Sequence, residues 1–219
     1  MNTQKFTNLF FLKLAVTLIC CSCQQKLLEE FKVYTNDFSS MDLQDIESDR
    51  GIFIFNEVPV LGNFNNEGFV LTLRNLPNHD MVRIEFDLYI HNYWNGNSQG
   101  IEGPDIWKME VDNVEIVNTT FANTPCESTY CQYQSFPENI FRSFPPRTGS
   151  VNTPLPGLFE QQFNLGWTTK YRITKILNHD RTQLILRCYD ELKQENALNP
   201  HEDESWSIGN LEVVLLNVY

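Results

Sequence analysis

The chain has 219 residues, of which 42% are hydrophobic, 13% aromatic and 20% charged. This length suits one ordinary domain with its own core, and the composition excludes a disordered chain and a membrane protein of several spans. The 16 basic and 28 acidic side chains give a formal net charge of −12. Nucleic acid and anionic membrane surfaces are therefore unfavourable partners, because both attract clustered Lys and Arg.

Residues 1–23 have the pattern of an export signal. A positive start precedes an apolar run that is shorter than the roughly 20 residues a membrane-spanning helix needs. Cysteines stand where a cleavage site belongs, so the segment resembles a bacterial lipoprotein signal, with Cys21 as the preferred lipidation site and Cys23 as the second choice. Ordinary cleavage and an uncleaved anchor are the alternatives. We expect residues 24–36 to be a polar tether and the protein to be a lipid-anchored envelope protein, in the outer membrane by that resemblance.

The body of the chain, residues 37–219, shows alternation of apolar and polar residues, which is typical of half-buried strands. Many short strands at turn-spaced intervals predict an all-β fold, a two-sheet antiparallel β-sandwich of jelly-roll type. Residues 136–159 hold five of the ten prolines and are predicted to form a long surface loop. The predicted strands are residues 51–55, 69–73, 82–90, 107–111, 115–121, 170–176, 183–188 and 211–216.

Three cysteines lie in this body. An exported chain can keep disulfides, and Cys126 and Cys131 are close enough in sequence to close a small disulfide loop. Cys188 lies within an alternating segment and is predicted to be a buried free thiol. The spacing of the first two is not a zinc signature and no second pair accompanies them, so we do not expect a zinc site.

Short motifs follow one another along the body. Phe86–Ile90 reads FDLYI, Gly103–Trp107 reads GPDIW and Asp203–Trp206 reads DESW. In this order they resemble the secreted bacterial β-sandwich modules of anchored and cell-surface proteins, which are similar to galactose-binding-like jelly rolls. The resemblance covers residues 51–219, and it implies a binding or structural module without established catalytic residues.

The chain departs from that family pattern at three positions. Asn92 and Asn95 stand where acidic residues are usual, and Gly209 replaces the aspartate of the last motif. Any metal site that belongs to the family pattern is therefore expected to be weaker in this chain.

A polar, glycine-bearing loop joins the first two motifs. Its oxygen atoms, with those of the last motif, are the hard ligands that Ca²⁺ prefers. Calcium is therefore the one candidate cofactor. The alternative, which the pattern favours, is that Asp105 and Asp203 only bond nearby backbone N–H groups. The candidate metal ligands are Asn95, Glu102, Asp105, Asp203 and Glu204.

Aromatic side chains that stand exposed beside Asn and Asp suit carbohydrate recognition, because sugars stack their apolar faces on aromatic rings. The aromatic residues considered are Tyr93, Trp94, Trp107, Trp167 and Trp206. Trp107 and Trp206 open alternating segments and are predicted to lie in the core. Trp94, within the polar loop, is the best candidate for an exposed ring. The candidate ligand-binding residues are Tyr93, Trp94 and Asn97.

These observations predict a non-catalytic binding module of the cell envelope, whose partner is a carbohydrate or another envelope component. One alternative is a carbohydrate-active hydrolase that uses carboxylates among Glu102, Asp105 and Asp203. A chain with 28 acidic residues always offers such pairs, so composition gives this alternative no support. Another alternative is a structural subunit of a surface complex, without a small-molecule ligand.

Overall fold

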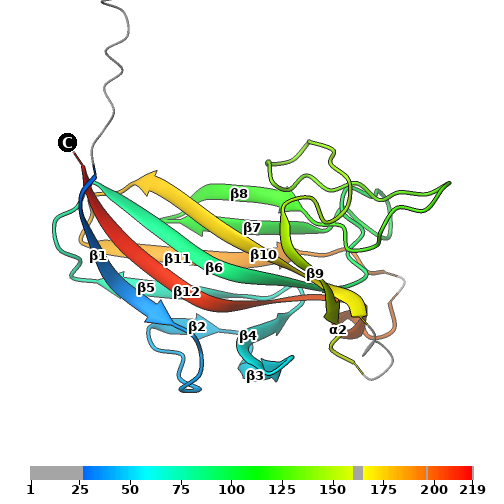
Figure 1. Ribbon diagram of the computed structural model, residues 1–219, viewed down its shortest axis with the longest axis horizontal. Coiled ribbons are helices and arrows are strands. Elements are labelled where there is room, and N and C mark those ends of the chain that lie inside the picture. Colours follow the sequence, from blue (N-terminus) through cyan, green and yellow to red (C-terminus); the bar gives the residue numbers. More distant parts are fainter. Residues whose placement is uncertain (1–26, 160–164, 196, 219) are drawn as a thin grey trace, which may run out of the picture.

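A computed structural model describes residues 27–159, 165–195 and 197–218 (Figure 1). Almost all of its regular structure is β, in two antiparallel sheets, which confirms the predicted β-sandwich of jelly-roll type. Sheet A has seven strands in the order β3-β4-β12-β6-β10-β9, with β1 also paired to β12, and sheet B has five in the order β2-β5-β11-β7-β8. The elements are β1 (Leu27–Asn36), β2 (Ile46–Ser48), β3 (Ile52–Phe55), β4 (Val58–Phe64), β5 (Gly68–Arg74), β6 (Met81–Asn92), β7 (Ile106–Val111), β8 (Val114–Thr120), β9 (Ser150–Pro156), β10 (Leu165–Asn178), β11 (Gln183–Glu191), α2 (Pro200–Asp203) and β12 (Glu204–Val218).

The core lies between the two sheets and follows from the alternation in the sequence. Strand β6 buries every second residue from Val82 to Ile90 on its inner face. The rings of Trp107, from sheet B, and Trp206, from sheet A, meet edge to face with their centroids 5.9 Å apart. Both are fully buried, which confirms that these two tryptophans belong to the core. Burying such rings is a large part of the stability of a domain this size.

Four strands lie outside the predicted set, namely β1, β2, β4 and β9. β1 occupies most of the expected tether, so the prediction of a tether over residues 24–36 is wrong from Leu27 onward. The segment becomes a strand because the long β12 offers it a free edge, along which Leu27 to Asn36 pair with Val218 to Leu211. β2 and β4 were not predicted at all.

The expected surface loop over residues 136–159 contains β9. Its prolines are compatible with a strand here because β9 is at the edge of sheet A, where a missing N–H costs no ladder bond.

The two ends of the sandwich differ in construction. At one end, called here the turn end, lie the short connections 75–80, 112–113 and 179–182, together with the start of β1 and the end of β12 (Figure 1). The opposite end, called the loop end, carries the long connections 93–105, 121–149 and 192–203. No helix among the described residues is long and apolar enough to cross a membrane.

Candidate functional site

The loops of the loop end are tied together by asparagine side chains. Asn97 donates from its amide nitrogen to the Arg142 carbonyl (2.7 Å) and accepts hydrogen bonds from Thr120 (2.5 Å) and Ser135 (2.9 Å). Its backbone N–H donates to the Tyr133 carbonyl (2.7 Å). All polar atoms of the Asn97 side chain therefore hold the protein's own loops, although Asn97 was a candidate for ligand binding.

Two carboxyl groups face each other in the interior at this end. Glu204 opens β12 and shares its inner face with Trp206, and Asp105 directly precedes β7 and shares the inner face of that strand with Trp107. Both acids have a relative exposure of 0%. Asn95 donates to both of them, from its backbone N–H to Asp105 Oδ2 (2.5 Å) and from its side-chain Nδ2 to Glu204 Oε1 (3.0 Å).

The environment of this acid pair opposes ionisation. Burial raises the pKa of Asp105 to about 7. Burial, together with the charges of Asp105 and Asp203, raises the pKa of Glu204 to about 11. No ion pair recorded among the described residues involves either member of the pair. Asp105 Oδ1 and Glu204 Oε2 are buried without a hydrogen-bond partner.

The structure therefore brings together three of the five predicted metal ligands, namely Asn95, Asp105 and Glu204. Asp203 is half-buried beside them, and Glu102 is exposed. No three His, Cys, Asp or Glu side chains gather as a metal site within the described part of the chain. The backbone bond to Asp105 Oδ2 is the kind of contact that the local-bonding alternative predicts.

Asn92 is the cross-strand partner of Glu204, and its own Oδ1 is buried without a hydrogen-bond partner. Sequence analysis treated Asn92 only as a departure from the family pattern. The signal that could have identified it is its place at the end of β6, where it pairs with Glu204 across the sheet.

Trp94 is not an exposed ring, so that prediction is wrong. Its relative exposure is 0%, and its indole N–H donates to the Ser205 carbonyl (2.9 Å). The ring packs edge to face against Phe121, with centroids 6.1 Å apart. The chain turns inward after β6, because an indole gains more from an apolar interior that also satisfies its N–H than from the surface.

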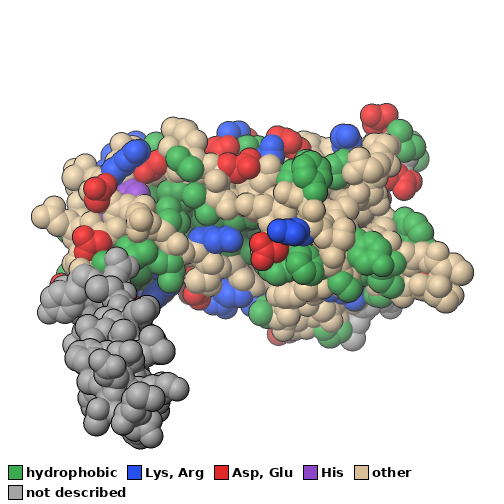
Figure 2. Space-filling view, turned by 90° about the horizontal axis from the view of Figure 1, so that it is seen from above, with side chains coloured by type: hydrophobic (Ala, Val, Ile, Leu, Met, Phe, Trp, Pro, Cys, Tyr) green, Lys and Arg blue, Asp and Glu red, His purple; other side chains and the backbone are tan. Residues whose placement is uncertain are grey.

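The neighbouring Tyr93 is the exposed aromatic residue, at 43%. Its ring meets Trp167 edge to face, with centroids 4.7 Å apart, and Trp167 is partly exposed. Sequence analysis named Trp167 among the tryptophans that suit carbohydrate recognition if exposed, but preferred Trp94; Trp167 follows Gly166 near the start of β10. Three further aromatic side chains of this end are exposed: Tyr130 (57%), Tyr133 (47%) and Phe141 (93%). Figure 2 shows hydrophobic side chains at the surface of the molecule.

The backbone beneath the Tyr93–Trp167 pair is fixed by buried polar groups. Asn123 donates to the carbonyls of Asn92 and Trp167, both at 2.8 Å. Arg147 donates to the carbonyl of Gly166 (2.5 Å) and to that of Asn123 (2.7 Å). The aromatic pair therefore stands on a backbone that has little freedom to move.

The structure describes the three cysteines of the body of the chain but not those of the expected leader. Cys126 and Cys131 form a disulfide in the long loop 121–149, and Cys188 is a buried free thiol in β11. The predicted lipidation sites Cys21 and Cys23 lie outside the described residues.

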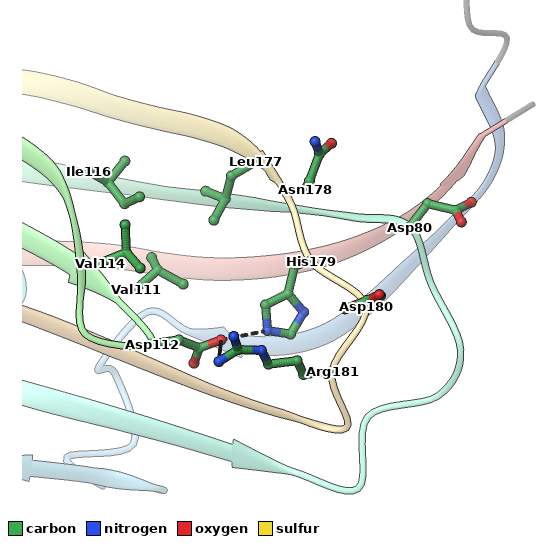
Figure 3. Close-up of a pocket in the computed structure, with 10 residues that line it drawn as sticks. All are labelled: Asp80, Val111, Asp112, Val114, Ile116, Leu177, Asn178, His179, Asp180 and Arg181. Carbon is green, nitrogen blue, oxygen red and sulfur yellow. Dashed lines mark ion pairs between the residues drawn. The ribbon is translucent and has the colours of Figure 1, made fainter.

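A hollow of about 450 Å³ opens at the turn end (Figure 3). Val114, Ile116 and Leu177 line its apolar side, and His179, Asp112 and Arg181 converge on the other. Asp112 Oδ2 lies 3.2 Å from His179 Nε2 and 3.5 Å from Arg181 Nη1. None of the candidate metal-ligating or ligand-binding residues from the sequence analysis lines this hollow.

No family model and no curated protein matches the chain. Among solved structures, it is similar to a native family 35 carbohydrate-binding module from Clostridium thermocellum, at 9% identity over 85% of this chain and 98% of that chain, with a TM-score of 0.35. It is also similar to the C-terminal CBM6 of the laminarinase LamC from Zobellia galactanivorans, at 11% identity over 85% of this chain and 99% of that one, with a TM-score of 0.32.

A third similar structure is the 4-O-methyl-α-glucuronidase BtGH115A, matched at 9% identity over 85% of this chain but only 18% of that chain, with a TM-score of 0.40. These three solved structures are two carbohydrate-binding modules and a carbohydrate-active enzyme. At such identities and TM-scores, neither a ligand nor a residue role can be carried over to this chain.

Proposed function

We propose that the protein is an exported, lipid-anchored envelope protein whose β-sandwich binds carbohydrate at its loop end without catalysing a reaction. The observation that carries the proposal is the solvent-facing pair of Tyr93 and Trp167 on a backbone held by Asn123 and Arg147. Sugars bind by stacking on aromatic rings that are already in place, because little ordering entropy is then lost on binding.

The position of this pair suits an anchored receptor. β1 starts at the turn end, so a tether that precedes Leu27 leaves the domain at the end opposite to the aromatic pair. The loop end then points away from the membrane. The disulfide of the long loop agrees with export, because disulfides persist in oxidising compartments.

The ligand is expected to be a neutral glycan. The chain carries a net charge of −12, and the connection beside Tyr93 includes Glu202 and Asp203, whose backbone carbonyls bond Asn92 and Tyr93. Polyuronates would meet like charge on approach, which slows association and weakens binding.

Burial removes one of the three candidate catalytic acids of the hydrolase alternative. Asp105 was one of the three carboxylates considered for that role, and its partner in the structure is Glu204. Both have an exposure of 0%, so a glycosidic bond cannot reach the pair that lies closest together at this end. The aromatic surface beside it remains suited to binding.

The test is a titration of the full chain with soluble neutral glycans and with polygalacturonate, followed by calorimetry. We expect at least one neutral glycan to bind, and we expect Tyr93→Ala and Trp167→Ala each to weaken its binding about tenfold, the size of a lost stacking contact. Phe31→Ala is the control, because Phe31 is also an exposed ring (54%) but lies on β1. The proposal fails if Phe31→Ala weakens binding as much as the other two, or if only polyuronates bind.

A further inference from the structure

We infer that Asp105 and Glu204, with Asn92, form the inner wall of a site for a divalent cation between the two sheets, and that calcium is the cation whose chemistry fits it. This inference is independent of glycan binding. It rests on three features of the site: its buried oxygens without partners, its charge, and the kind of ligands around it.

Asn95 occupies one oxygen of each carboxyl group. Its two N–H groups bond Asp105 Oδ2 and Glu204 Oε1, which leaves Asp105 Oδ1 and Glu204 Oε2 without partners. The two carboxyl groups are also close enough for each to shift the other's ionisation. Either a proton shared by the two groups or a metal ion can complete this pair, and the oxygen of Asn92 favours the ion.

Asn92 adds a third oxygen. It is the cross-strand partner of Glu204, and such partners have neighbouring side chains on one face of a sheet. Its amide nitrogen donates to the Glu202 carbonyl (3.1 Å), which fixes the side chain and leaves Oδ1 buried at a residue exposure of 2%, without a partner. A proton shared by the two carboxyl groups does nothing for this third oxygen, whereas a cation binds all three.

Charge favours a divalent ion. The two buried carboxylates carry two negative charges when ionised, and neither forms an ion pair recorded among the described residues. A charge buried without a partner is costly, and a divalent cation balances both at once. Because Asn92 and Asn95 are neutral, the site does not hold excess negative charge.

The ligand set favours calcium over magnesium. Ca²⁺ accepts six to eight oxygens from carboxylates, amides and backbone carbonyls in irregular geometry, whereas Mg²⁺ requires a regular octahedron and keeps several waters. The oxygens here come from the ends of three strands, β6 and β12 of sheet A and β7 of sheet B. Asn95, whose Oδ1 accepts a hydrogen bond from Gln132, bonds both acids. Carboxylate and amide oxygens drawn from separate elements suit calcium better than magnesium.

The experiment is thermal unfolding of the full chain after chelation, with CaCl₂, MgCl₂ or no added metal, and no glycan present. We expect calcium at about a hundredfold its Kd to raise the midpoint by about 5–10 °C, and magnesium to have little effect. The double variant Asp105→Asn/Glu204→Gln should lose the calcium shift. Glu102→Gln is the matched control and should keep it, because Glu102 is exposed on the same connection.

Calcium titration by calorimetry decides the case in which the double variant does not fold. One equivalent of bound calcium on the wild-type chain, lost on chelation, supports the site. If wild-type protein shows neither a midpoint shift nor heat of binding, the inference is overturned and the two acids share a proton instead. An equal calcium shift in the double variant also overturns it, because the ion then binds elsewhere. The glycan titration above is unaffected by any of these results.

Discussion

The two ends of the sandwich bury polar groups in opposite ways. At the turn end, the Asp112 carboxylate lies 3.2 Å from His179 Nε2 and 3.5 Å from Arg181 Nη1, so basic groups of the chain itself lie beside it (Figure 3). At the loop end, Asp105 and Glu204 are buried more deeply, yet face each other without a cation from the described chain. A protein keeps such a pair only where something external, a metal ion or a proton, completes it. The comparison separates a structural cluster from a candidate site.

The histidines of the turn end extend its balanced network. His79 Nε2 lies 2.6 Å from His179 Nδ1, and His79 Nδ1 lies 2.6 Å from the Pro77 carbonyl. With both rings neutral, their two hydrogens serve these two contacts, and His179 Nε2 faces Asp112 without a hydrogen. A third hydrogen, gained on protonation, completes the chain from Pro77 to Asp112.

The largest effect is expected from Asp112→Ala at the turn end. The substitution removes the partner of Arg181 and His179, and also the acceptor for the Ile185 backbone N–H (2.9 Å). Losing the acceptor of this partly buried N–H, together with the contact to His179, costs about 2–3 kcal/mol, which urea unfolding would measure. Asp180→Ala is the control: Asp180 borders the same hollow but is exposed, and its loss should change stability by less than about 0.5 kcal/mol. Equal losses of stability in the two variants would mean that the contacts of Asp112 do not stabilise the fold.

The second expected effect is a pH dependence of the free energy of unfolding, caused by Asp190 at the loop end. Burial raises the pKa of Asp190 to about 6, although it accepts hydrogen bonds from Trp206 Nε1 (2.7 Å) and from two backbone N–H groups. Between pH 4 and 6 the folded chain holds a proton here that the unfolded chain has released. Stability should therefore fall by about 2–3 kcal/mol as pH rises through this range. Urea unfolding should show a larger fall in wild type than in Asp190→Asn, by about 2–3 kcal/mol over this pH range. The slope that remains in the variant belongs to Asp105 and Glu204, whose pKa values burial also raises. An unchanged slope in the variant would contradict the role of Asp190.

Most of the fold could be predicted from the sequence because alternation is a local property. β6, with its regular inward residues from Val82 to Ile90, is the clearest case. β1 could not be predicted, because it is a strand only through its pairing with β12, which lies at the other end of the chain. Long-range pairing of this kind leaves no trace in a short window of sequence.

The site was predictable in part for the same reason. Asp105 and Glu204 stand out by residue type within their motifs, and the structure joins them. Which of two adjacent aromatic residues faces solvent depends on how the chain turns after β6, so Tyr93 and Trp94 could not be told apart. The contribution of Trp167 depends on a strand 70 or so positions later meeting that turn, which only the fold decides.

The third prediction compares the stability of Glu204→Gln, at the loop end, with that of Asp112→Ala, at the turn end. In chelator at pH 7, burial keeps the proton on Glu204, so glutamine replaces a neutral side chain of nearly the same shape. We expect a change in stability of less than about 1 kcal/mol, smaller than that of Asp112→Ala although Glu204 is the more deeply buried acid. Urea unfolding of both variants in chelator measures the difference. A loss of 3 kcal/mol or more, roughly the cost of breaking a buried ion pair, would show that Glu204 already has a partner.

The smallest effect is expected from the histidines. Burial lowers the pKa of His179, and the Asp112 carboxylate partly opposes that shift. A histidine held neutral by the fold makes stability decrease as pH falls below its ordinary value of 6.5, because the unfolded chain then binds the proton more readily. In the native state, the ring signals of His179 followed by NMR should titrate below that value, and Asp112→Asn should lower the midpoint further. If Asp112→Asn leaves the midpoint unchanged, the carboxylate does not receive the third hydrogen, and the turn end is no better balanced than the loop end.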